Sequence, residues 1–234
     1  METPGYARHA FAGEIERLEH DLLEMGSRAE EMVGMAVQSL CTVDVPLAKE
    51  VCRRDDEIDA KDLEIEDRCI RLLGLQHPIA TELRVISTAM KMITDIERIG
   101  DLAVEIAKIA MKIEKELGRA DIIDIPRMAK LAQRMIRESL EAYVKRDLDL
   151  VRSICANDDE VDDLYRALRG QLFDSMRSNP DNVVVDSWLL LAIHHVERIA
   201  DHATNIAERV SFMVTGRFEQ LAPSHRSDAP AEGP

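Results

Sequence analysis

Two rows of oxygen-bearing side chains, each spaced four residues apart, occur one hundred positions apart in the chain. They are Glu97, Asp101 and Glu105 in the first row, and Glu197, Asp201 and Asn205 in the second. In a helix, four residues advance about 6 Å along the axis and turn about 40°, so each row forms a slanting line on one face. Like charges at this spacing destabilise an isolated helix by roughly 0.2–0.5 kcal/mol per pair. Their recurrence therefore calls for a reason.

Each row has an acidic counterpart earlier in the sequence, on what should be the neighbouring helix. These counterparts are Asp55 with Asp59, and Asp158 with Asp162. The pattern continues as Asp62 and Glu66 in the first case but as Tyr165 and Arg169 in the second. If the paired helices lie side by side, their carboxylates can converge on one or more ions, with fewer ligands expected in the second set.

The chemistry of such rows is cation binding. Carboxylates favour hard or borderline cations with oxygen ligands, namely Fe, Mn, Mg and Ca, and less typically Zn. The alternative is a solvated helix face on which Arg98 and Arg198 form local ion pairs. One such row would favour that alternative, but two matched rows with acidic partners favour a metal site. His194 lies one turn before Glu197, yet its counterpart is Thr94, which favours a polar role over direct ligation.

Apolar periodicity and helix-ending signals predict six helices that would position these rows. They cover residues 14–40, 45–73 and 78–118, a fourth helix after Asp124 with Pro126 in its first turn, then about 148–177 and 181–216. The polar, Pro-containing segment 218–234 is predicted to be a disordered tail.

An internal repeat sets the architecture. Residues 97–99 and 197–199 are both Glu-Arg-Ile, and Cys52 matches Cys155 at an offset of 103. The apolar stripe that includes Ile99 recurs around Ile199 on the face opposite the acids. The sequence therefore predicts an all-α protein of two tandem three-helix bundles related by a pseudo-twofold axis. Their predicted ranges are 1–120 and 121–217.

Composition narrows the function further. The 234 residues carry a net charge of −15, which disfavours nucleic-acid binding. The four cysteines show no CxxC pair, which favours buried reduced thiols. No signal peptide or membrane-spanning segment is apparent, so we expect a cytoplasmic protein. Motifs for nucleotide hydrolysis or for serine or zinc-protease chemistry do not occur.

The repeated motifs resemble those of the PhoU family of phosphate-signalling proteins. The resemblance is carried by residues 97–101 and 197–207, supported by Gln76-His77-Pro78 and Glu82-Leu83-Arg84. It implies two symmetric three-helix bundles whose E(D)xxxD motifs bind multinuclear iron or zinc clusters. The differences between Glu105 and Asn205, and between Gly100 and Ala200, predict that the two sites bind metal unequally.

The resemblance also implies a role and partners. It implies a cytoplasmic regulator that works with the ATPase subunit of the phosphate ABC transporter and with the phosphate sensor histidine kinase. Such a regulator represses the phosphate-starvation response and restrains uptake, reaches the membrane only through its partners, and commonly forms a homodimer or larger oligomer.

Three functions therefore remain open. The preferred one is a non-enzymatic metal-binding adaptor. A di-iron carboxylate enzyme is the first alternative, although its Glu-x-x-His pairs project into a four-helix core, whereas these rows are ExxxD. A metal-free helical scaffold is the second.

Overall fold

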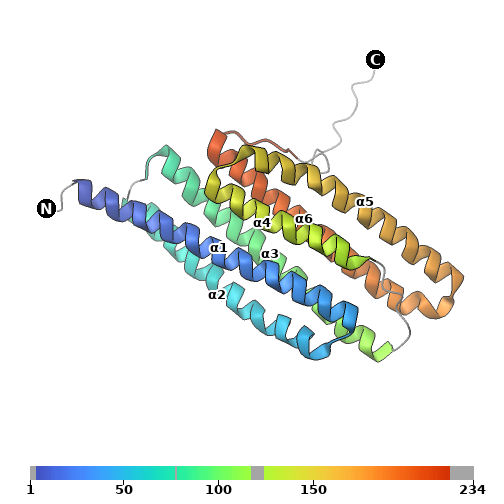
Figure 1. Cartoon of the computed structure of the whole chain (residues 1–234). Coiled ribbons are helices and arrows are strands. Elements are labelled where there is room, and N and C mark those ends of the chain that lie inside the picture. Colours follow the sequence, from blue (N-terminus) through green and yellow to red (C-terminus); the bar gives the residue numbers. More distant parts are fainter. Residues whose placement is uncertain (1–3, 77, 117–123, 222–234) are drawn as a thin grey trace, which may run out of the picture.

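The computed structural model describes residues 4–76, 78–116 and 124–221. Within these residues it is all-helical, as predicted (Figure 1). The helices are α1 (Pro4–Thr42), α2 (Val45–Gln76), α3 (Ala80–Glu116), α4 (Ile125–Lys145), α5 (Leu148–Ser178) and α6 (Val183–Thr215), with a 3-10 turn, η1 (Pro180–Asn182), before α6. The predicted boundary at residues 120/121, the Gly118 helix end, His77 and positions 222–234 lie outside the described residues.

Two helix ends differ most from the predicted ones: α1 begins at Pro4 instead of near residue 14, and α2 continues past the glycine predicted to end it. Gly74 was expected to end the second helix, but α2 continues to Gln76. One glycine costs about 1 kcal/mol in a helix interior, which is little for a helix of 32 residues. Asp147 does cap α5, since its side chain accepts hydrogen bonds from the N–H groups of Asp149 and Leu150.

The segment after α6 folds back along that helix. The ring of Phe218 stacks on Phe212 at 3.7 Å between centroids, and the Leu221 N–H donates to Glu208 Oε1 at 2.6 Å. Leu221 also packs against the hydrophobic core. The first residues of the predicted tail are therefore held against α6.

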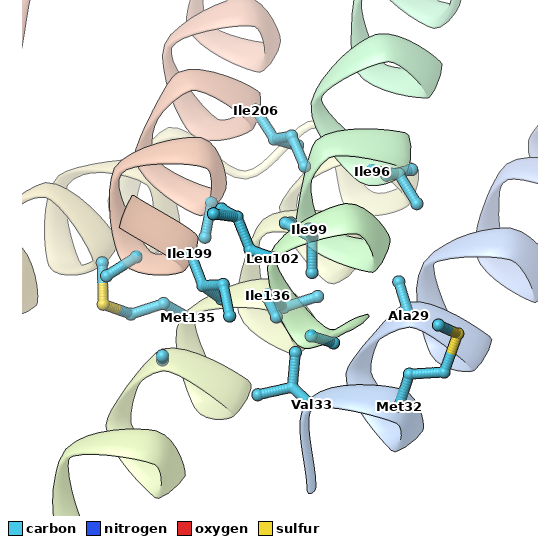
Figure 2. Packing of buried hydrophobic residues seen from close by; sticks show 14 of the residues in the cluster. Ala29, Met32, Val33, Ile96, Ile99, Leu102, Met135, Ile136, Ile199 and Ile206 are labelled. Atoms are coloured by element: carbon cyan, nitrogen blue, oxygen red, sulfur yellow. The ribbon is translucent and has the colours of Figure 1, made fainter. Parts of the chain in front are cut away.

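Helices α3 and α6 pack against each other and form the centre of the molecule (Figure 1). The first repeat places α1 and α2 against α3, and the second places α4 and α5 against α6, while α1 also contacts α4. Figure 2 shows Ile99 and Leu102 of α3 beside Ile199 of α6, with Met135 and Ile136 of α4 close by. One hydrophobic core thus runs through both repeats.

Glycines let α1 and α4 approach closely. A Cβ atom on Gly26 would lie 2.5 Å from Leu140 Cδ1 and 3.2 Å from Leu140 Cγ. Leu140 is itself buried, so it has little room to move. The α1–α4 contact therefore depends on the absence of a side chain at position 26.

Replacement by alanine should change the free energy of unfolding in opposite directions at two glycines of this fold. Gly170→Ala, in α5, meets nothing within 4 Å, so we expect a gain of about 0.5–1 kcal/mol in the free energy of unfolding. Gly26→Ala should instead destabilise the protein, because overpacking costs about 1–3 kcal/mol and outweighs the gain in helix propensity. Urea denaturation of both variants measures this, and a stabilised Gly26→Ala protein would show that Leu140 yields freely.

Candidate metal centres

The first acidic cluster lies between α2 and α3. Asp55 and Asp59 come from α2, and Glu97 and Asp101 from α3. Burial, followed by repulsion from Asp59, Asp101 and Glu97, raises the pKa of Asp55 to about 6. The pKa of Glu97 is raised by burial and by Asp101. The two predicted rows therefore do converge across the helix pair.

Gly100 contributes to this cluster through its lack of a side chain. A Cβ atom at this position would lie 3.1 Å from Asp55 Oδ1 and 3.5 Å from Ile58 Cγ2. The backbone of α3 thus leaves space directly beside a carboxylate of α2. The second repeat has the buried Ala200 at the matching position.

The second acidic cluster lies between α5 and α6. Asp158 is 1% exposed, and the Thr204 hydroxyl donates to its Oδ1 at 3.3 Å. Burial, followed by Asp201, Asp162 and Asp158, raises the pKa of Glu197 to about 7. Burial, followed by Asp158 and Asp201, also raises the pKa of Asp162. The same four positions of the repeat therefore meet again in the second half of the chain.

The third member of each α3 or α6 row has different surroundings in the two repeats. Glu105 lines a hollow of about 320 Å³ together with Asp55 and Asp101, and Lys108 Nζ lies 2.7 Å from its carboxylate. The Asn205 amide instead donates to Asp95 Oδ1 of α3 at 3.5 Å. His195 and Arg198 of α6 line the same hollow, so the third member of each row lies at the interface between the repeats, and Glu105 does so beside acids of its own cluster.

The outer positions also differ between the clusters. Asp62 extends the first one, and its pKa is raised by burial and by Glu66 and Asp59. In the second, the Arg169 guanidinium lies over the Tyr165 ring at 5.3 Å, and that ring lies 6.1 Å from the His194 ring. Aromatic and cationic groups therefore replace two acids.

The contact between the repeats contains polar residues to which the sequence pattern gave no role. His202 Nδ1 of α6 lies 2.9 Å from Asp95 Oδ1 of α3, and both side chains are largely buried. These residues are 107 positions apart, so no helical spacing pairs them. The repeat gives no signal for this pair either, because the counterparts of Asp95 and His202 are His195 and Leu102.

The candidate ligands of the two acidic clusters fit a hard cation. They are all carboxylate or amide oxygens, the type that Fe, Mn, Mg and Ca accept. Glu197 Oε2 is buried without a hydrogen bond, although His194 Nδ1 lies 3.1 Å away. Across the described ranges, no three His, Cys, Asp or Glu side chains stand close enough together to hold a metal ion as they are placed. Binding would therefore require the carboxylates to reorient toward a shared ion.

A known family of protein domains matches each of the two repeats separately. The model of the PhoU domain matches residues 22–110 and again residues 125–210. Two relatives are described as phosphate-specific transport system accessory protein PhoU homologs. The one from Clostridium acetobutylicum is 36% identical over 92% of this chain and 98% of its own length. The one from Synechocystis sp. is 37% identical over 91% and 94%, respectively.

Solved structures show the same likeness. The crystal structure of PhoU from Pseudomonas aeruginosa matches with a TM-score of 0.84 and 33% identity, over 88% of this chain and 100% of that one. The phosphate transport system regulatory protein PhoU from Streptococcus pneumoniae matches with a TM-score of 0.81 and 29% identity, over 89% and 99%.

Proposed function

The chain belongs to the PhoU family, as its repeated motifs predicted, and from that premise we propose that it regulates phosphate uptake and the response to phosphate starvation. Its relatives carry the names of accessory and regulatory proteins, not of enzymes. It covers nearly their whole length, so the comparison concerns the complete relatives and not a shared module.

Both acidic clusters hold metal ions in this proposal, with Fe or Zn preferred and Mg, Mn or Ca as alternatives. The residues that would hold them are Asp55, Asp59, Glu97, Asp101 and Glu105 in the first cluster and Asp158, Asp162, Glu197, Asp201 and Asn205 in the second. The supporting observation is that burial and mutual repulsion raise carboxyl pKa values in both clusters. Bound cations would neutralise these acids and tie α2 to α3 and α5 to α6.

The regulator acts through other proteins. Its partners are the ATPase subunit of the phosphate ABC transporter and the phosphate sensor histidine kinase, and it represses the starvation response when phosphate is plentiful. It works in the cytoplasm as a homodimer and reaches the membrane through its partners. In the part of the chain that the structure describes, no helix is long and apolar enough to cross a bilayer.

Deleting the gene tests the regulatory role. In phosphate-rich medium the deletion should switch on phosphate-regulon expression, measured with an alkaline phosphatase reporter, and the wild-type gene should restore repression. Repression that persists in the deletion strain, with any paralogue also removed, would refute the proposal. Oxygen-dependent turnover by the iron-loaded protein would favour the di-iron enzyme instead.

Elemental analysis tests the metal sites. Glu97→Gln/Asp101→Asn should lower the metal content by about the amount that the first cluster binds, since each lost carboxylate removes a charged ligand. Asp67→Asn/Asp174→Asn, which neutralises two exposed acids paired only with arginines four and three residues away, should retain the wild-type content. Equal metal in all three proteins would exclude the first cluster.

A further inference from the structure

Helix α4 differs in charge from the rest of the protein. It carries five basic side chains and two acidic ones, in a chain whose net charge is −15. Among the six described helices, it alone has more basic than acidic residues. A local excess of the opposite sign on so acidic a protein indicates a surface with its own role.

Four of these residues lie along one face of α4, here called the basic face. They are Arg127, Lys130, Arg134 and Arg137. Steps of three, four and three residues keep them on one side of the helix over about 15 Å. They line a hollow of about 530 Å³ together with Asp124, Pro126, Leu131 and Gln133. The cations are therefore aligned along a concave surface.

Ion pairs within the protein neutralise this face only in part. Arg137 forms a close pair with Glu30 of α1 at 2.5 Å. Arg127 lies 3.7 Å from Glu160, and Arg134 lies 3.9 Å from Glu138, which is beyond ordinary hydrogen-bond distance. No ion pair of Lys130 occurs within residues 4–76, 78–116 and 124–221. Three of the four cations thus retain most of their capacity to bind an anion.

The basic face is confined to the second repeat. Ser39 and Ser139 are both buried and donate to the carbonyl three residues earlier, which fixes the offset of one hundred between α1 and α4. At this offset the counterparts of the basic face are Ser27, Glu30, Gly34 and Val37. The first repeat thus builds its equivalent helix without basic residues at these four positions.

We propose that the basic face of α4 binds an acidic helix of a partner protein. Its charges are about 4.5 and 6 Å apart along the axis, the same spacing as carboxylates three and four residues apart on a helix lying alongside. A membrane surface fits less well, because helices that lie on membranes present apolar side chains beside the basic ones. The exposed large apolar residue of α4 is Val144, at the far end of the helix. This surface is separate from both acidic clusters.

Fluorescence anisotropy of the full chain tests the proposal. The probe is a fluorescein-labelled helical peptide of Ala, Gln and Glu with glutamates three and four residues apart, compared with the same peptide carrying Gln for Glu. The test variant is Arg127→Glu/Lys130→Glu/Arg134→Glu, which leaves the Arg137–Glu30 pair intact. The control, Arg71→Glu/Arg152→Glu/Arg177→Glu, makes the same charge change at three exposed arginines elsewhere.

We expect the wild type to bind the Glu peptide, more weakly as salt rises, and the Gln peptide at least about tenfold less tightly. The test variant should lose binding about tenfold, and the control less than twofold. Equal loss in both variants, or no binding by the wild type, would overturn the proposal. So would binding of phosphatidylglycerol vesicles, but not of the peptide, through the basic face. Self-association that disappears only in the test variant would show that a second copy occupies this face instead.

Discussion

Glu197→Gln should make the metal-free protein more stable at pH 8 while weakening its stabilisation by metal. Burial and three neighbouring aspartates raise the pKa of Glu197 from 4.5 to about 7. Because the folded state binds this proton more tightly than the unfolded state, its contribution is fully present below about pH 4.5 and is lost as the pH rises through 7. At pH 8 the ionised carboxylate costs up to about 3 kcal/mol. The neutral amide removes that cost, so we expect a gain of about 1–3 kcal/mol.

Urea denaturation with a chelator at pH 5 and pH 8 measures this effect. The wild type should lose stability between the two values, and the variant should lose less. Asp174→Asn, which neutralises an acid that is 75% exposed, should change the free energy of unfolding by less than about 0.5 kcal/mol. Adding the bound metal at pH 8 should then stabilise the wild type more than Glu197→Gln. A variant that is destabilised under all these conditions would show that the carboxylate has a structural role.

Buried, mutually repelling carboxylates lower the stability of the metal-free protein, and each of the two clusters adds to that cost. A residue set that weakens the fold in this way is typical of sites kept for binding. The cluster built on Asp55, whose pKa is raised to about 6, should show the same trend with a smaller gain.

The helices and the acidic rows could be predicted because both depend on local spacing. Short connections bring α2 against α3 and α5 against α6, so Asp55 and Asp158 could be expected beside the later rows. The burial of each acidic side chain could not be predicted in this way. Asp158 is almost completely buried and is bonded by Thr204, whereas its counterpart Asp55 lies beside Gly100. Such differences depend on single residues of the facing helix.

The contact between the repeats could not be predicted from spacing within either one. The pairing of Asp95 with His202 requires that α3 and α6 lie side by side, which no periodicity specifies. Asn205 was predicted as a ligand because it continues the row from Asp201. Its amide reaches Asp95 across the helix pair instead, and whether it also serves the second cluster stays a prediction. A sequence repeat reveals equivalent positions, but their partners follow from how the two copies pack.

Ile199→Ala should lower the free energy of unfolding by about 2–5 kcal/mol, because it opens a cavity between α3 and α6. Ile199 is fully buried in the core shared by both repeats (Figure 2). Leu191→Ala, in the same helix but 44% exposed, should cost far less.

The same variant decides whether the two repeats unfold as one unit. Trp188 is the single tryptophan, and Lys112 of α3 lies 4.1 Å from its ring, so its fluorescence reports on α6 and its contact with α3. Circular dichroism reports on all helices together. Because one core joins the repeats, urea curves from the two signals should coincide in the wild type and shift together in Ile199→Ala. A fluorescence transition that moves alone, leaving half of the helical signal in place, would mean that the repeats are separate folding units despite their common core.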